Sequence, residues 1–400
     1  MLNIKREIYL KRLRPHYGNQ LIKFITGQRR VGKSFLLRQV ASEIRENFPD
    51  HQVLFIDKEQ FEFDEIRDYR QLYQYVKDKA SAGMNCVFID EIQEITEFEK
   101  ALRSLLNEGN FDIYCTGSNS ALFSGNLATL LSGRQVSITV YSLSFNEFVE
   151  FHKLPCDQNS LGMYLKYGGL PYLMYLPKDD QIVFDYLKNI NSTILFRDIL
   201  SRYEIRDVAF LTNLIHFLAD NTGSITVAKR IADFMKSQGE SKTVNLILNY
   251  LQYLQDAYLL KFARRYDIQG KRIFEQGGKY YFQDHGLRNS IVGLKPGDSG
   301  KLVENLVHNH LVMLGYEVFV GVMKNLEIDF IAEKQGEKVY FQAALMLPDE
   351  NVIQREFGNL LLIQDQYPKY VISMDTMNVM NSYEGIRHLS LMEFLMKEKF

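Results

Sequence analysis

Residues 27–34, GQRRVGKS, carry glycines, a lysine and a serine at the spacing G-x-x-x-x-G-K-[ST]. The segment follows the apolar run LIKFIT and precedes FLLRQVASEIREN, where apolar residues recur every three or four positions. A glycine-rich turn between a strand and a helix presents backbone N–H groups and the positive end of the helix dipole to phosphate oxygens. We therefore predict a phosphate-binding loop, in which Lys33 reaches the β- and γ-phosphates and the Ser34 hydroxyl ligates Mg²⁺.

The whole loop is expected to line the nucleotide. The residues expected to bind the cofactor are Gly27, Gln28, Arg29, Arg30, Val31, Gly32, Lys33, Ser34 and Phe35. Arg29 and Arg30 leave three alternatives open, because their side chains could face phosphate, a neighbouring subunit or solvent.

An acidic pair follows a second apolar run in CVFIDEIQEI. Asp90 and Glu91 stand at the carboxyl end of this predicted strand, where open parallel sheets bind their ligands. We expect Asp90 to hold Mg²⁺ through water, and Glu91 to orient or deprotonate the attacking water.

The next predicted strand, FDIYCTGSNS, ends in polar residues. Ser118 or Asn119 fits a sensor of the γ-phosphate, and a polar turn in which Asn119 or Ser120 caps a helix fits equally well. Arg134, in LLSGRQVSITV, fits either an arginine finger supplied to another subunit of a homo-oligomer or a surface arginine.

Composition narrows the class of protein. The 400 residues are 46% apolar and 24% charged, which suits a folded chain of more than one domain. Lys+Arg of 47 against Asp+Glu of 49 excludes a global basic field. Three cysteines without a C-x-x-C spacing, and apolar runs shorter than the roughly 18–20 residues of a membrane span, predict a cytoplasmic protein without membrane contact.

Periodicity divides the chain. Residues 1–150 alternate strand-like and helix-like segments, which predicts an α/β domain with a parallel sheet covered on both faces. Helical periodicity prevails over about 160–260, and a smaller α/β unit follows a short β-rich stretch.

Short motifs along nearly the whole chain add to this prediction of the domains. They are GQRRVGKS, CVFIDEIQE, CTGSNSALFSG, LLSGR followed by SLSFNEF, YLKYGGLPY, ILFRDIL, KYYFQDHGLRNS, LVENLVHNHLVMLGYEV and EIDFIAE. The combination resembles the prokaryotic AAA-type P-loop ATPases that have a C-terminal domain of unknown function. The resemblance implies an ATP-binding domain over 1–150, a helical linker over 151–204, a winged-helix-like domain over 205–285 and a PD-(D/E)xK nuclease-like domain over 286–400.

The middle region has three helical segments and then a basic hairpin. The start of the third helix and the hairpin offer Lys242, Thr243, Asn245, Arg264, Arg265, Lys271 and Arg272 as contacts to duplex DNA, and Lys279 adds to the hairpin's positive charge. The alternative is that this region only packs against other domains, and that its basic residues form a solvated face.

A nuclease of the resembled type needs a helix acid, an aspartate on one strand and acid-x-Lys on the next. Glu304 and Asp329 match the first two, but Gln342 stands where the acid belongs and Ala344 where the lysine belongs. We expect a degenerate site, kept as a structural or DNA-contacting remnant, in which Glu304 and Asp329 bond to Arg355 or hold a weak metal.

Together these patterns predict Mg²⁺-dependent ATP binding and hydrolysis that drives a conformational change in a module binding DNA or a protein partner. A slow nucleotide-gated switch and an ATP-regulated nuclease are the alternatives.

Overall fold

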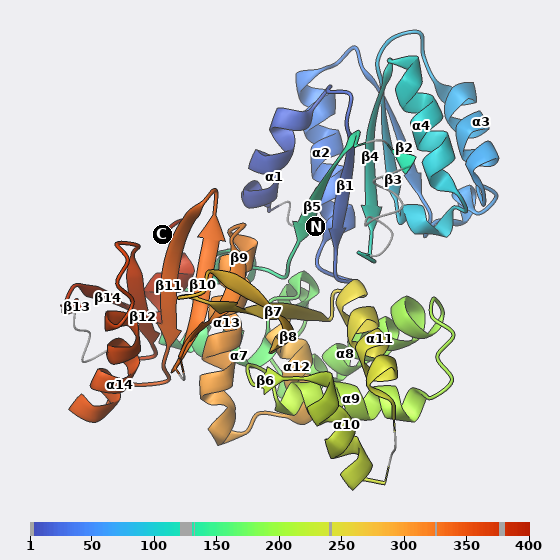
Figure 1. Cartoon of the computed structure of the whole chain (residues 1–400). Helices are drawn as coiled ribbons and strands as arrows, with labels where there is room; N and C mark the ends of the chain where they lie inside the picture. The colour runs from blue at the N-terminus through green and yellow to red at the C-terminus, as the bar shows by residue number, and fades with distance from the viewer. Residues whose placement is uncertain (1–3, 121–129, 132, 240–241, 325, 376–380) are drawn as a thin grey trace. The chain divides into compact units, whose positions relative to one another are not determined.

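The computed structural model describes residues 4–120, 130–131, 133–239, 242–324, 326–375 and 381–400. The chain forms two compact units (Figure 1). The first comprises Met1–Tyr141 together with Asp256–Tyr258, and the second comprises Ser142–Gln255 and Leu259–Phe400.

Among the described residues, no helix has both the length and the apolar character needed to span a membrane.

A five-stranded parallel sheet forms the centre of the first unit. Its strands are β1 (Ile22–Gly27), β2 (Gln52–Asp57), β3 (Asn85–Asp90), β4 (Phe111–Gly117) and β5 (Gln135–Val140), in the spatial order β2-β3-β4-β1-β5. Every adjacent pair is parallel, so all five carboxyl ends lie at one edge of the sheet. The predicted parallel α/β sheet of the first region is thus confirmed.

Helices cover both faces of this sheet (Figure 1). They are α1 (Glu7–Leu13), α2 (Lys33–Asn47), α3 (Tyr69–Lys79) and α4 (Phe98–Glu108). Because the sheet is covered twice, β1, β3 and β4 are buried along their whole length and read as nearly continuous apolar runs.

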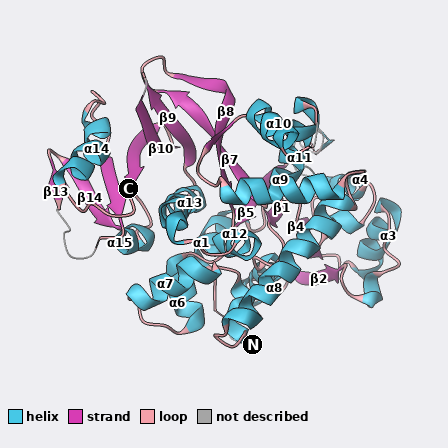
Figure 2. Ribbon diagram, turned by 90° about the horizontal axis from the view of Figure 1, so that it is seen from below, coloured by secondary structure: helices cyan, strands magenta, loops and turns pink. Residues whose placement is uncertain are grey.

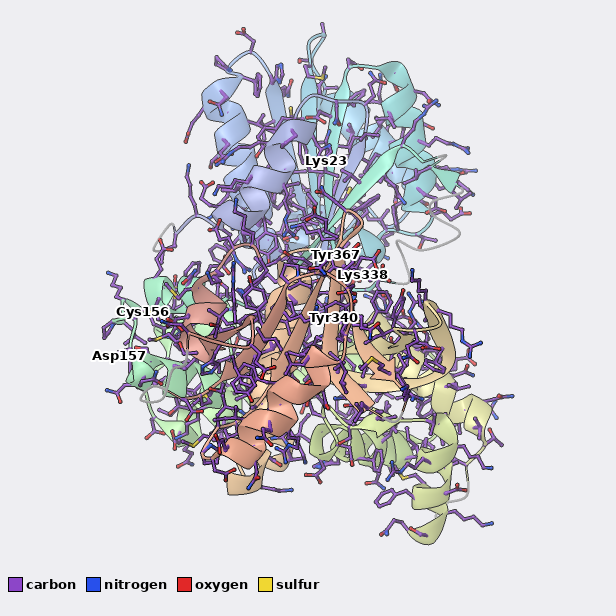
Figure 3. The ribbon with its side chains drawn as sticks, turned by 60° about the vertical axis from the view of Figure 1, so that its left-hand side comes forward. Lys23, Cys156, Asp157, Lys338, Tyr340 and Tyr367 are labelled. Carbon is purple, nitrogen blue, oxygen red and sulfur yellow. The ribbon has the colours of Figure 1, made fainter. Side chains whose placement is uncertain are left out.

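A buried ion pair joins the amino-terminal halves of β1 and β4. Lys23, labelled in Figure 3, has no exposed surface and its ammonium bonds to the Asp112 carboxylate. The Tyr114 hydroxyl and the Gly18 N–H donate to the same carboxylate at 2.7 and 2.9 Å. Burial lowers the pKa of Lys23, and Asp112 opposes that shift. This pair fixes β1 beside β4, and therefore fixes the relative positions of the segments that follow these strands.

A nine-stranded mixed sheet organises the second unit, in the order β13-β14-β12-β11-β10-β9-β7-β8-β6. The strands are β6 (Ile225–Thr226), β7 (Leu260–Asp267), β8 (Arg272–Phe282), β9 (Glu317–Met323), β10 (Leu326–Lys334), β11 (Glu337–Ala343), β12 (Lys369–Ser373), β13 (Ser382–Tyr383) and β14 (Ile386–Ser390). The basic hairpin β7–β8 joins the C-terminal strands through a parallel pairing of β7 with β9 (Figure 2). Regions 205–285 and 286–400 therefore share one sheet.

The helices of this unit are α6 (Phe145–His152), α7 (Gln158–Tyr167), α8 (Asp180–Thr193), α9 (Val208–Asp220), α10 (Ala228–Ser237), α11 (Val244–Asp256), α12 (His285–Val292), α13 (Ser299–Met313), α14 (Glu350–Leu361) and α15 (Leu391–Met396). A π-helical segment, Ile194–Leu200, continues α8. Helix α12 packs against α7, α8 and α9.

The Lys23–Asp112 pair gives the first prediction. Removing one partner leaves the other charge buried, so Lys23→Met or Asp112→Leu alone should lower the free energy of unfolding by about 3–5 kcal/mol. The double variant should recover most of the loss, because both charges are then gone. Urea unfolding measures this, and single variants as stable as the wild type would contradict it.

Candidate functional site

The predicted phosphate loop joins β1 to α2. At Gly27 the backbone has φ +140°, and a Cβ there would lie 2.2 Å from the Val140 carbonyl oxygen of β5, so only glycine fits. Gly32, with φ +97°, is the N-cap of α2. The loop therefore passes close to β5 and directs the amino end of α2 toward the carboxyl edge of the sheet.

Lys33 lies inside this loop. Its side chain is almost fully buried, and Nζ donates to the Gln28 carbonyl oxygen at 3.0 Å. The ammonium is thus held next to the loop backbone.

A residue outside the motif braces the loop. Arg6 is buried, and its Nη1 donates to the carbonyl oxygens of Val31 and Tyr141 at 2.9 and 3.0 Å. The Arg6 N–H also donates to Gln39 of α2 at 3.3 Å. The sequence analysis missed Arg6, because nothing local distinguishes it from the other basic residues of the N-terminus.

The two loop arginines differ. Arg29 is buried, with Nη1 3.8 Å from the Glu59 carboxylate. Arg30 is exposed and has φ +69°. The sequence analysis left phosphate, a neighbouring subunit or solvent as the surroundings of these side chains. Arg30 faces solvent, and Arg29 does not. Phe35, one residue past Ser34, is half exposed.

Asp90 ends β3 beside the loop. Its carboxylate hydrogen-bonds to the Ser34 side chain and accepts from the Thr116 hydroxyl of β4. Burial raises the pKa of Asp90, the two hydroxyls oppose this, and the nearby Glu91 and Asp57 charges raise it further. A cation at this point would favour the ionised carboxylate.

Glu91 has an unusual backbone. Its φ and ψ are both +54°, a left-handed conformation that costs free energy in a non-glycine residue. Thr116 Oγ1 accepts the Glu91 N–H at 2.8 Å, and Glu91 Oε2 accepts from Ser118 Oγ at 3.4 Å and from the Gln93 side-chain amide. The structure therefore brings together two of the predicted site residues, Glu91 and Ser118, with Asn119 buried next to Ser118.

Thr116 is the second residue whose role the sequence analysis missed. One hydroxyl serves both acids, because it donates to Asp90 and accepts from the Glu91 N–H. The available signal was a polar residue at the end of the otherwise apolar run FDIYC, directly before a glycine.

Arg134 lies at the opposite edge of the sheet. The Ile22 N–H, at the start of β1, donates to the Arg134 carbonyl oxygen at 2.9 Å, and the exposed side chain donates to Asn107 at 2.7 Å. About 17 Å of strand separates that edge from Gly27. Arg134 therefore does not belong to the site of its own chain.

The residues present suit ATP and Mg²⁺. A serine hydroxyl and an aspartate carboxylate in contact form the oxygen donor set that Mg²⁺ prefers. Both polar atoms of the fully buried Gln28 amide lack a partner within the described part of the chain, which suits a polar ligand nearby. No cluster of three or more His, Cys, Asp or Glu that could hold a metal occurs among the described residues.

The residues expected to contact DNA have varied surroundings. Thr243, Asn245 and Lys271 are exposed, whereas the Lys242 ammonium pairs with Asp207 at 2.5 Å. Three arginines also have local partners. They are Arg264 with Glu317 at 3.0 Å, Arg265 over the Phe274 ring at 4.8 Å, and the exposed Arg272 with Asp267 at 3.6 Å.

Lys279 is not part of the solvated hairpin face, and that expectation is wrong for this residue. It is buried, and its Nζ lies 2.7 Å from Glu304, 2.6 Å from Glu327 and 3.6 Å from Asp329. Burial alone would lower the pKa of Lys279, but these carboxylates raise it, so the lysine is charged.

The predicted degenerate site assembles around this lysine. Glu304 of α13, Asp329 of β10 and Gln342 of β11 meet there, and the Asp329 N–H donates to Gln342 Oε1 at 3.3 Å. Burial raises the pKa of Asp329 to about 7, although Lys279 opposes the shift. The expected bond of this pair to Arg355 is wrong, because Arg355 pairs with the adjacent Glu356 at 2.6 Å.

A family match covers most of the first unit. Residues 19–149 match the family model described as an AAA domain, and residues 158–298 match a domain of unknown function, DUF8612. Among solved structures, Orc1 of Aeropyrum pernix in complex with DNA is 11% identical, with 72% of this chain and 91% of that chain covered and a TM-score of 0.31. AMPPCP-bound DnaA of Aquifex aeolicus is 12% identical, with 63% and 89% covered and a TM-score of 0.27.

Two relatives match over most of the chain. An uncharacterized protein of Methanocaldococcus jannaschii is 29% identical over 331 residues, which cover 78% of this chain and 71% of the relative. An uncharacterized protein of Haemophilus influenzae is 36% identical over 379 residues, which cover 92% of this chain and 93% of the relative. The chain therefore belongs to the family of this Haemophilus influenzae protein, and its residues 19–149 form an AAA domain.

Proposed function

We propose that the chain binds and hydrolyses ATP with Mg²⁺ and uses the nucleotide cycle to change how its second unit binds duplex DNA. One observation carries the first half of this proposal. Beside the glycine-rich loop, Asp90 bonds to both Ser34 and Thr116, and Thr116 also accepts the Glu91 N–H. This arrangement supports a cation-binding role for Asp90 and a role as base for Glu91 beside the predicted phosphate loop.

The roles of the residues follow from their positions. Lys33 and the loop N–H groups bind the phosphates, and Ser34 and Asp90 would hold Mg²⁺. When bound, Mg²⁺ neutralises charge on the phosphate oxygens. The Glu91 carboxylate accepts the proton of the attacking water. Hydrogen bonds from Ser118 and Gln93 orient this carboxylate.

Two further residues complete the proposal. Asn119 and Ser118, at the end of β4, are the candidate contacts to the γ-phosphate. Arg134 is exposed at the amino edge, so in a homo-oligomer it could serve another subunit's nucleotide.

The second half rests on the order of elements α9, β6, α10, α11 and the hairpin β7–β8, which is that of a winged helix. Thr243 and Asn245 are exposed in and just before the first turn of α11, the candidate recognition helix, and Lys271 and Arg272 are exposed at the turn of the hairpin. These residues could reach bases and phosphates. A protein partner bound by the same surface is the second candidate.

A nuclease role is less well supported. The lysine that the reaction requires is absent from β11, and Lys279 already pairs with the acids.

The nucleotide half is tested by steady-state hydrolysis. Lys33→Ala and Glu91→Gln should each lower kcat at least about 100-fold, because one removes a phosphate contact and the other the base. Glu91→Gln should still bind ATP. Lys79→Ala, an exposed lysine on α3, is the control and should match the wild type. Equal rates in Glu91→Gln and the wild type would remove Glu91 from the mechanism, and wild-type ATP binding without measurable turnover would favour the slow switch.

The raised pKa of Asp90 predicts a pH dependence of Mg²⁺ affinity. The carboxyl must lose its proton to hold the cation, so affinity should rise with pH and fall by up to about tenfold per unit below the pKa. The measurement is the Mg²⁺ concentration that half-saturates ATP binding, followed from neutral pH down to the lowest pH at which the protein stays folded. Asp90→Asn should make the Mg²⁺ affinity less dependent on pH. The dependence that remains in this variant reflects protonation of the nucleotide. Identical slopes in both proteins would contradict the assignment.

The DNA half is tested by anisotropy of a labelled duplex at about 50 and about 200 mM salt. Lys271→Ala and Arg272→Ala should each weaken binding at every sequence and reduce the salt slope by about one, as expected for phosphate contacts. Lys188→Ala, exposed on α8, is the matched control. Salt slopes that equal the wild-type slope would exclude the hairpin as a source of phosphate contacts. If the wild type does not bind the duplex, a protein partner is the favoured alternative.

A further inference from the structure

Three residues at the junction of α11 and β7 belong to the first unit by their contacts. Asp256–Tyr258 group with Met1–Tyr141, although Gln255 before them and Leu259 after them group with the second unit. Along the chain, α11 ends at Asp256 and β7 begins at Leu260. The segment therefore connects the first unit covalently to both candidate DNA-contacting elements.

Asp256 binds the segment after β4. The Ser120 N–H donates to the Asp256 carbonyl oxygen at 2.9 Å, and Ser120 Oγ donates to Asp256 Oδ1 at 3.1 Å. Ser120 directly follows Asn119, and Ser118 donates to Glu91. Asp256 is buried, so this pair of bonds is partly shielded from water.

Tyr258 binds the end of β1. Its hydroxyl hydrogen-bonds to the side chains of Thr26 and Thr139, and these two threonine hydroxyls are 3.2 Å apart. Thr26 directly precedes Gly27, the first residue of the phosphate loop. Burial raises the pKa of Tyr258, so its hydroxyl keeps its proton at neutral pH.

The segment is held in one conformation. Tyr258 has φ +55°, a left-handed backbone that persists in a non-glycine residue only where surrounding contacts require it. Ala257, between the two contact residues, has no exposed surface. These contacts would make Asp256–Tyr258 move with the end of β1 and with Ser120.

We propose that Asp256 and Tyr258 are positioning residues that couple the nucleotide site to α11 and β7. Asp256 acts through Ser120 on the residues that face the γ-phosphate, and Tyr258 acts through Thr26 on the phosphate loop. This inference rests on the proposed function, since it assigns the route by which ATP alters the DNA-contacting elements.

The test is hydrogen exchange of the full chain, with and without ATP and Mg²⁺, followed in peptides that cover residues 244–256. In the wild type, ATP should change the exchange rate of these amides at least about threefold. In Asp256→Ala the change should be lost while ATP still binds. Asp233→Ala, an exposed aspartate on α10, is the matched control and should respond like the wild type.

Kinetics separate positioning from mere stability. Asp256→Ala should lower kcat about fivefold and leave the KM for ATP within about twofold. Asp256→Asn keeps an oxygen that can accept from Ser120 and should recover most of kcat. Ser120→Ala should lower kcat as much as Asp256→Ala does. The double variant should lose no more kcat than either single variant, because each change removes the same side-chain hydrogen bond between Ser120 and Asp256. If Asp256→Ala does not fold, Asp256→Asn and Ser120→Ala carry the comparison.

The outcomes distinguish the two proposals. A wild type whose 244–256 amides ignore bound ATP, or variants that keep the full response and kcat, would overturn the coupling and leave the ATPase proposal standing. A wild type that binds no ATP would overturn both.

Discussion

The position of β4 between β1 and β3 is the constraint on which the site depends. Parallel pairing aligns the three carboxyl ends, so the loop after β1, the acids after β3 and the polar residues after β4 meet at one edge. The buried Lys23–Asp112 pair holds β1 and β4 together at their other ends. A change in register of one residue would turn the Thr116 side chain to the opposite face of the sheet and break both of its bonds.

The local electrostatics of the first unit suit a bound cation. Asp90 and Glu91 are buried and close together, and burial raises the pKa of Asp90. The hydroxyls of Ser34 and Thr116 offset part of this cost, but a hydroxyl brings no net positive charge. Lys33 is turned toward a backbone carbonyl. A cation at this edge would offset the negative charge of the two carboxylates. Within our proposal the anionic phosphate chain enters together with that cation, which links nucleotide binding to Mg²⁺ binding.

How much the sequence could predict depended on the range of the interactions. The strand, loop and helix around residues 27–34, and the acids of β3, are set by local pattern, so their positions could be predicted. Arg6 and Thr116 act through bonds to residues 25 and 26 positions away. No local pattern marks Arg6, and the local pattern at Thr116 shows a polar strand end but not its two partners. The parallel pairing of β7 with β9 joins strands more than 50 residues apart, and for this reason two regions predicted as separate domains share one sheet.

The surroundings of Lys279 could not be predicted either, because its partners are distant in the sequence. They also bear on the function of the second unit. A lysine on β8 supplies the positive charge that β11 lacks, but it does so by pairing with Glu304 and Glu327 and by lying close to Asp329. The ammonium lies among one buried and two partly buried carboxylates, in the place where a divalent cation would have to bind, and removing it would leave several charges uncompensated. The ion pairs of Lys279 also connect β8 to α13 and β10, and so stabilise the hairpin β7–β8 at the end opposite its turn. Within our proposal this favours a second unit that acts by binding, whose state is set by the ATP site of the first.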